Sequence, residues 1–262
     1  MLQAIIFDHD GTIVPSSKRQ EQWFKHWSKL HNVDWPFQDF SEFLNFYNTN
    51  VHKPNGVQNV YDAMKLPCNM KDNNHPVWHA FNAFNKEHPL KPYDGIVETI
   101  KEIWRMGSLN DRPGRWTRTR LGINTSNSWE SISHDLRNAG LLEYFDTIVT
   151  EEVLRNFHGT DSQSIIKPST IPIGIMLGLL NTSGSYTLHV GDTLNDLRCS
   201  QKVLRLNPMR PESLITIGAC YGYEGRTILE QGVELGTTTV KFNHLIDKPQ
   251  ELIPIVQEYL LS

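Results

Sequence analysis

Four aspartates carry the clearest chemical signal in this sequence of 262 residues. Asp8 and Asp10 follow a short apolar run near the start of the chain, and Asp192 and Asp196 follow another apolar run. Ligands of an open parallel sheet bind beyond the carboxyl ends of its strands, so we expect these carboxylates to converge if the two runs are neighbouring strands. Converging carboxylates repel one another unless a cation joins them, and oxygen ligands favour Mg²⁺. These residues therefore predict a magnesium site.

Donor groups are expected at the same edge of the sheet. A third apolar run ends in Thr125-Ser126-Asn127, and Lys167 precedes the strand that leads to Asp192. A hydroxyl and an ammonium group beside the metal would supply hydrogen-bond donors and positive charge. That combination suits a dianionic phosphoryl group, whose transfer depends on positioning and on charge stabilisation.

Short apolar runs alternate with amphipathic segments over most of the chain. Such alternation predicts an α/β fold, a Rossmann-like parallel sheet with helices on both faces. The expected strands are residues 4–7, 121–125, 145–149, 186–190, 215–220 and 238–242, and the expected helices are residues 94–106, 128–138, 171–180 and 249–261.

The segment between the first strand and the rest of the sheet has a different texture. Aromatic residues recur there at helical spacing, and no convincing strand is present. We interpret residues 16–88 as an inserted α-helical cap domain, and residues 1–15 and 89–262 as the Rossmann-like core.

The acidic and donor residues fall into four ordered motifs: Phe7-Asp8-His9-Asp10-Gly11-Thr12, Ile123-Asn124-Thr125, Lys167-Pro168 and Gly191-Asp192-Thr193-Leu194-Asn195-Asp196. In this order they resemble the haloacid dehalogenase superfamily, and within it the phosphoglycolate phosphatase-like members with a helical cap. The resemblance covers nearly the whole core, whereas the cap matches only in position and helical texture. It implies a Mg²⁺-dependent phosphatase that hydrolyses a small-molecule phosphomonoester, phosphoglycolate-like or a sugar phosphate, through an aspartyl-phosphate intermediate.

The resemblance also implies a role for each acidic residue. Asp8 resembles the nucleophile, and Asp10 the general acid that protonates the leaving group and then activates water. The metal would be held by the Asp8 carboxylate, the Asp10 backbone carbonyl and Asp192. Asp196, also counted with the metal residues, would support the metal's waters or Lys167.

The remaining residues of the motifs are expected to contact the phosphoryl group. Thr125 would bond a phosphoryl oxygen, and Lys167 would offset the charge of the aspartyl phosphate. His9, Ser126 and Asn127 are predicted to bind the phosphate. His9 departs from the family pattern, in which an apolar residue is commoner.

Two other functions stay open. A β-phosphoglucomutase-like phosphotransferase would use the same core, and a non-catalytic binding or regulatory protein would keep only the fold. A dehalogenase is disfavoured, because a halide leaving group needs no proton and Asp10 would not be required as a general acid. The substrate's identity and the cap residues that select it cannot be read from the sequence.

Composition narrows the possible partners. The formal net charge of −4 gives no overall basic field, so no nucleic-acid partner is expected. No apolar run is long enough to span a membrane, and the start of the chain lacks the basic flank of a signal peptide. The 3 cysteines form no metal-binding spacing, which fits a reducing compartment. We therefore expect a cytoplasmic protein, monomeric or homodimeric.

One basic segment does not belong to the predicted site. Residues 107–120 carry four arginines around a tryptophan, which invites a nucleic-acid interpretation. The segment precedes the strand at 121–125, so it should lie at the amino edge of the sheet, away from the carboxylates. We expect a surface loop there, with a partner-binding site as the alternative.

Overall fold

The chain forms two compact units. The computed structural model describes residues 2–51, 56–70, 72, 74–109, 118–158, 165–203 and 211–261. One unit comprises Met1–Pro15 and Lys91–Ser262, and the other comprises Ser16–Leu90. The first unit contains the sheet, and the second is built from helices in the part of the chain that is described.

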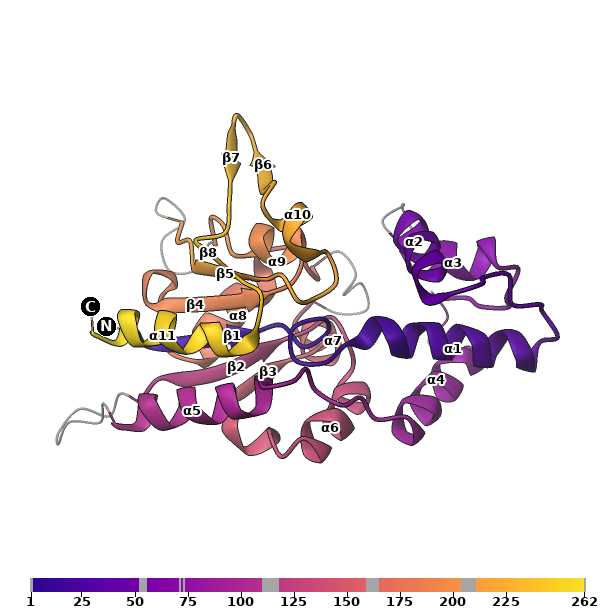
Figure 1. Ribbon diagram of the computed structural model, residues 1–262, viewed down its shortest axis with the longest axis horizontal. Coiled ribbons are helices and arrows are strands. Elements are labelled where there is room, and N and C mark those ends of the chain that lie inside the picture. Colours follow the sequence, from indigo (N-terminus) through magenta and orange to yellow (C-terminus); the bar gives the residue numbers. More distant parts are fainter. Residues whose placement is uncertain are drawn as a thin grey trace. The chain divides into compact units, whose positions relative to one another are not determined.

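A parallel sheet with helices around it forms the first unit (Figure 1). Its 6 strands have the order β3-β2-β1-β4-β5-β8, and every neighbouring pair is parallel. The strands are β1 (Ala4–Phe7), β2 (Arg120–Asn124), β3 (Thr147–Val149), β4 (Thr187–Gly191), β5 (Ile215–Ala219) and β8 (His244–Ile246). The predicted α/β fold class is confirmed.

The central strand sets the register of the functional edge. Phe7, the last residue of β1, pairs with Ile123 of β2 on one side and with Val190 of β4 on the other. The three strands therefore end at the same level. The residues that follow them (Asp8, the segment from Thr125, and Asp192) start from one edge of the sheet.

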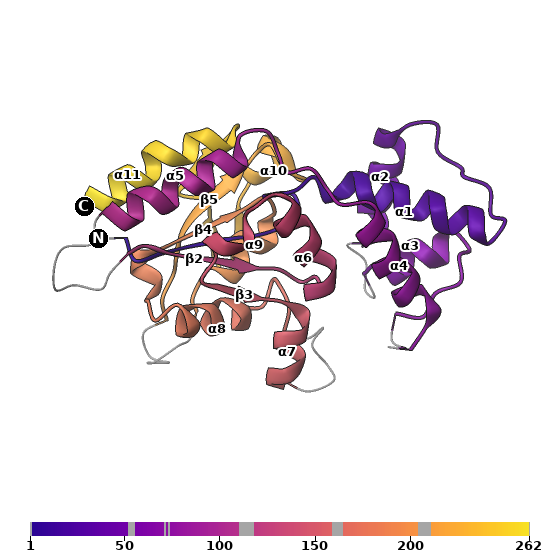
Figure 2. The same cartoon turned by 90° about the horizontal axis from the view of Figure 1, so that it is seen from below.

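Helices cover both faces of the sheet (Figure 2). Ala4 and Ile6 of β1 point to one face, where they join a buried cluster with Ile173 and Met176 of α8. α5 and α11 pack against each other on the opposite face. The helices of this unit are α5 (Ile96–Leu109), α6 (Trp129–Asn138), α7 (Glu151–His158), α8 (Ile171–Leu179), α9 (Leu194–Cys199), α10 (Gly225–Leu229) and α11 (Leu252–Leu261).

The last strand of the sheet differs from the prediction. The strand expected at residues 238–242 corresponds to β7 (Thr238–Val240), which pairs antiparallel with β6 (Val233–Leu235) in a separate hairpin. This hairpin projects from the first unit (Figure 1). The sixth sheet strand is instead β8, which the sequence analysis did not recognise because three residues show too little periodicity.

The second unit has its own aromatic core. Its helices are α1 (Ser16–Leu30), α2 (Phe40–Val51), α3 (Gln58–Ala63) and α4 (Pro76–Glu87). Trp23 is fully buried, and its indole N–H donates to the Tyr61 hydroxyl over 2.7 Å, which satisfies the one polar atom of the ring. The other buried residues of this core are Phe24, Trp27, Phe43, Val60, Met64, Leu66, Val77 and Phe84.

The basic segment is described only at its two ends. Helix α5 continues to Leu109, past the expected loop start at Gly107, and Arg112, Arg115 and Trp116 lie outside the described residues. Arg118 forms an ion pair with Asp146, and the Arg120 guanidinium donates to the Leu180 carbonyl. These two arginines thus bind the protein's own surface at the amino end of β2.

Among the described helices, none combines the length and the apolar character needed to cross a lipid bilayer.

Candidate active site

A tight turn after β1 places the first two carboxylates. The Gly11 N–H donates to the Val14 carbonyl over 2.7 Å, and the N–H groups of Ile13 and Val14 both donate to the His9 carbonyl. Gly11 adopts φ +81, a region that residues with a side chain rarely adopt. A Cβ at this position would lie 1.9 Å from Asp192 Oδ2, so the turn needs glycine for its backbone and for the space beside Asp192.

The second pair of aspartates comes from β4 and the first turn of α9. Asp192 directly follows β4, whereas Asp196 is held by a capping box. The Thr193 side chain accepts from the Asp196 N–H, and Asp196 Oδ2 accepts from the Thr193 N–H over 3.2 Å and from its hydroxyl over 2.6 Å. Helix capping therefore fixes the Asp196 carboxylate at the sheet edge.

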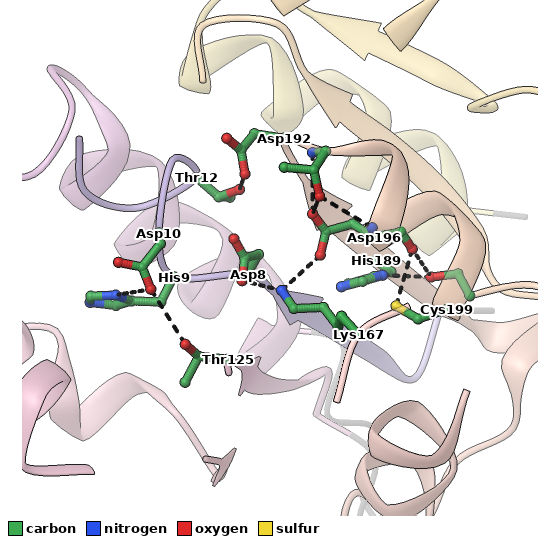
Figure 3. A network of polar contacts seen from close by, with 12 residues as sticks. Asp8, His9, Asp10, Thr12, Thr125, Lys167, His189, Asp192, Asp196 and Cys199 are labelled. Atoms are coloured by element: carbon green, nitrogen blue, oxygen red, sulfur yellow. Dashed lines mark hydrogen bonds and ion pairs between the residues drawn. The ribbon is translucent and has the colours of Figure 1, made fainter. Parts of the chain in front are cut away.

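Three of the four predicted acidic residues form a buried cluster (Figure 3). Asp8, Asp192 and Asp196 are 5%, 0% and 1% exposed. Each offers a carboxylate oxygen that lies within 4.8 Å of the other two. Three buried carboxylates at these distances are unfavourable as anions unless a positive charge lies between them.

Lys167 supplies one such charge. Its Nζ forms an ion pair with Asp8 Oδ1 and another, over 2.8 Å, with Asp196 Oδ1. The lysine side chain is 10% exposed, so both contacts lie in a poorly solvated place. The sequence analysis expected Lys167 to reach this site, and the structure puts it between two of the carboxylates (Figure 3).

The pKa values of the three carboxyl groups show that Lys167 offsets only part of their negative charge. Burial, together with Asp196 and Asp10, raises the pKa of Asp8 to about 7, although Lys167 opposes the shift. Burial raises the pKa of Asp192 well above its usual range, and the charges of Asp8 and Asp196 add to the rise. The pKa of Asp196 is lowered, because the charge of Lys167 and hydrogen bonds from Lys167 and Thr193 outweigh its burial. The protein alone thus leaves two carboxylates poorly stabilised as anions.

A divalent cation fits this cluster. Three carboxylates and one ammonium group leave two uncompensated negative charges when all are ionised, and hard oxygen donors suit Mg²⁺. Asp192 Oδ2 also accepts from the Tyr223 N–H over 2.7 Å, so its carboxylate is oriented by the backbone. Both Asp196 oxygens already receive donors from Lys167 and Thr193.

The Asp10 side chain points toward Thr125 and away from this cluster (Figure 3). Asp10 Oδ2 accepts from Asn127 Nδ2 over 2.6 Å, and the Thr125 hydroxyl lies 3.4 Å from the same oxygen. The buried His9 ring is also near, with Nδ1 at 3.4 Å from Asp10 Oδ2. Ser126, between Thr125 and Asn127, is solvent-exposed.

Some residues around the site were not assigned by the sequence analysis. Tyr223 orients Asp192, Tyr221 donates its hydroxyl to the Thr12 carbonyl over 3.0 Å, and the Tyr93 ring packs against Tyr221. Glu224 Oε2 accepts the Leu194 N–H at the start of α9. These contacts depend on loop geometry, for which the sequence gives no residue-level signal.

The buried His189 is linked to the backbone of Asp196 through the Ser200 hydroxyl. His189 Nδ1 lies 2.5 Å from the Ser200 hydroxyl, which donates to the Asp196 carbonyl over 2.9 Å. Burial lowers the pKa of His189 to about 4, so the ring is neutral at ordinary pH. In the sequence, this residue is a histidine within an apolar strand, a pattern that does not by itself indicate a function.

Comparison with known proteins places this geometry in context. The model of the haloacid dehalogenase-like hydrolase family matches residues 5–204. Pyrophosphatase PpaX of Bacillus cereus (strain B4264) is 22% identical over an alignment of 261 residues that covers 97% of this chain and 96% of that protein.

Solved structures share the fold along the full chain. CbbY from Rhodobacter sphaeroides in complex with phosphate superposes with a TM-score of 0.64 at 21% identity, covering 96% of each chain. Magnesium-bound YfnB from Bacillus subtilis gives a TM-score of 0.66 at 16% identity, covering 97% of this chain and 98% of that one.

Proposed function

This chain belongs to the haloacid dehalogenase-like hydrolases, and from that premise we propose that it is a Mg²⁺-dependent phosphatase acting on a small-molecule phosphomonoester. Phosphoglycolate-like compounds and sugar phosphates are the proposed substrates. The observation that carries the proposal is the contact of Lys167 with Asp8 inside a cluster that also contains Asp192. A carboxylate between a cation site and an ammonium group is suited to attack a dianionic phosphoryl group.

Asp8 is proposed to act as the nucleophile. One of its oxygens attacks phosphorus in line, the bond from phosphorus to the leaving oxygen breaks, and an aspartyl phosphate forms. Asp10 gives its proton to the leaving oxygen. Asp10 then accepts a proton from a water molecule that attacks phosphorus, the bond between phosphorus and the Asp8 oxygen breaks, and inorganic phosphate leaves the regenerated Asp8 carboxylate.

The surrounding groups are proposed to stabilise charge during both steps. Asp8, Asp192 and the Asp10 backbone carbonyl would hold Mg²⁺, with Asp196 in support. When bound, the ion draws electron density from the phosphoryl oxygens and offsets their charge. Thr125 and Lys167 would donate hydrogen bonds to the phosphoryl group, and the helical unit Ser16–Leu90 would serve as the cap that excludes bulk water.

A phosphate-release assay tests the proposal. We expect Mg²⁺-dependent turnover of p-nitrophenyl phosphate and of at least one member of a panel of sugar phosphates and phosphoglycolate. Asp8→Asn should abolish turnover, because an amide is a poor nucleophile. Asp247→Asn is the matched control, since Asp247 is exposed and pairs with Arg226. Turnover by Asp8→Asn equal to the wild type would reject Asp8 as the nucleophile.

Inorganic pyrophosphate is a second candidate substrate, favoured by the likeness to proteins named pyrophosphatase. The same panel should include it. A phosphate leaving group needs less help from an acid than an alkoxide does, so Asp10→Asn should slow ester hydrolysis more than pyrophosphate hydrolysis. A long-lived phosphoenzyme with slow hydrolysis would instead indicate phosphoryl transfer to a second hydroxyl, and no turnover of any compound would favour a non-catalytic role.

A further inference from the structure

Three polar side-chain atoms lie near one oxygen of the proposed acid–base residue. Asn127 Nδ2 is 2.6 Å from Asp10 Oδ2, whereas Thr125 Oγ1 and His9 Nδ1 are each 3.4 Å from it, and His9 Nδ1 forms no hydrogen bond. The amide contact is the one with the length of a strong hydrogen bond to a charged acceptor. Asn127 is therefore the main partner of Asp10 among these three residues.

Hydrogen bonds of the Asn127 backbone hold this residue, and with it the side-chain amide, in place in the absence of substrate. The Asn127 N–H donates to the Thr125 hydroxyl over 3.1 Å, and the Asn127 carbonyl accepts from the Glu151 N–H at the start of α7 over 3.1 Å. Two residues further on, the Trp129 N–H donates to the Glu152 carboxylate. The segment after β2 is thus bonded to the first turn of α7 at two residues, Asn127 and Trp129.

We propose that Asn127 is a positioning residue that fixes the Asp10 carboxylate for proton transfer, an inference that rests on the proposed phosphatase function. An N–H that donates to Oδ2 disfavours a proton on that oxygen, so the proton that Asp10 exchanges is carried by Oδ1. The amide also restricts rotation of the carboxylate. Asn127 acts through Asp10 in this proposal, and its predicted contact with phosphate is the alternative role.

A positioning role and a direct contact with phosphate predict different dependences of the rate on the leaving group. The value of kcat/KM reports phosphoryl transfer to Asp8, in which Asp10 protonates the leaving oxygen. General acid–base catalysis contributes about 10²–10⁴-fold, and we expect Asn127→Ala to lose roughly 10- to 100-fold on an alkyl phosphate. On p-nitrophenyl phosphate, whose leaving group needs little protonation, the loss should stay under about threefold.

The closing experiment is a series of phosphate monoesters whose leaving groups span a wide range of pKa values, assayed with wild type, Asn127→Ala and Asn127→Leu. We expect log kcat/KM to fall more steeply with leaving-group pKa in both variants, with unchanged inhibition by inorganic phosphate. Asn127→Leu nearly keeps the side-chain size, adds no charge, and answers the question if Asn127→Ala does not fold. Asn138→Ala, an exposed asparagine at the end of α6, should match the wild type.

A double variant supplies the second criterion. If Asn127 acts through Asp10, adding Asn127→Ala to Asp10→Ala should cost nothing further in kcat/KM. An equal loss across the ester series together with weaker inhibition by inorganic phosphate would overturn the positioning role and leave the phosphatase proposal standing. A wild-type enzyme that turns over no ester would instead reject the phosphatase proposal itself.

Discussion

Lys167 is the single side chain on which the electrostatics of the carboxylate cluster depend most directly. It contacts both Asp8 and Asp196, and these two carboxylates outweigh its burial and raise its pKa. The ammonium group is therefore protonated at neutral pH. Removing it leaves buried carboxylates without their partner, which costs more than the ion pair itself contributes.

We expect Lys167→Met to lower the free energy of unfolding by about 3–5 kcal/mol near pH 8 and to lower kcat at least about 100-fold. The loss of stability should shrink below pH 7, because Asp8 can then take up a proton. Chemical denaturation at the two pH values measures this. Lys241→Met, at an exposed position, is the control. An equal loss of stability at both pH values would contradict the proposed charge balance.

The raised pKa of Asp8 also predicts how metal binding depends on pH. In the metal-free fold this pKa rises from 3.8 to about 7, so the folded state binds the proton more tightly than the unfolded state. The corresponding stability is present below pH 3.8 and is lost as the pH rises through about 7. If Asp8 holds Mg²⁺ as proposed, the ion and protons compete for the same carboxylate.

Thermal unfolding with and without Mg²⁺ tests this competition. At a concentration about 100-fold above Kd, a ligand adds about 2.7 kcal/mol, which raises Tm by roughly 5–10 °C. We expect this gain at about pH 8 and a much smaller one at about pH 5, where protons hold the carboxylates. Asp192→Asn should remove the gain at both pH values. A larger Mg²⁺ effect at the lower pH would contradict the assignment.

At the scale of the elements, the turn after β1 connects backbone conformation with metal binding. Gly11→Ala would place a methyl group 1.9 Å from Asp192 Oδ2, in addition to the strain of φ +81. Gly236→Ala is a matched control, because Gly236 has φ +69 and nothing within 4 Å of the added Cβ. Strain alone costs about 1–2 kcal/mol.

We expect Gly236→Ala to lose only that amount of stability and to keep full Mg²⁺ binding. Gly11→Ala should lose more stability and most of its affinity for Mg²⁺, measured by isothermal titration calorimetry. Similar affinities in the two variants would mean that Asp192 can move aside without consequence for the metal.

The elements also show what the sequence could and could not predict. β1, β2 and β4 were recognisable because fully buried strands read as apolar runs, and each ends directly before a polar motif. β7 was misplaced because its β-branched sequence, Thr238-Thr239-Val240, fits an edge hairpin as well as a sheet strand. The contact between Asn127 and Asp10 could not be predicted, since it depends on loop geometry that has no periodicity.

At the scale of the whole molecule, the two compact units have separate hydrophobic cores. The helical unit buries an aromatic cluster around Trp23, which contacts the rings of Trp27, Phe81 and Phe84. The sheet unit has its own cluster around Ala4 and Ile6. Damage to one core should therefore stay within its unit, because stability is distributed in cooperative substructures.

We expect Trp23→Ala to destabilise the helical unit by about 3–5 kcal/mol. Hydrogen exchange followed by mass spectrometry should show faster exchange in peptides from residues 16–90, with unchanged protection of β1, β2 and β4. Trp129→Ala is the control, since that ring is 40% exposed. Faster exchange in the sheet peptides of Trp23→Ala would show that the two units unfold together.

The two ends of the described chain lie side by side on the sheet unit (Figure 1). The Leu2 N–H donates to the Tyr259 carbonyl over 3.1 Å, so a short linker can join them without displacing either β1 or α11. The tip of the β6–β7 hairpin, at Gly236, then becomes the natural place to reopen the chain, because no side chain crowds it. A circular permutant cut there would carry its new ends away from the catalytic edge, which makes it a suitable scaffold for attaching fluorescent reporters.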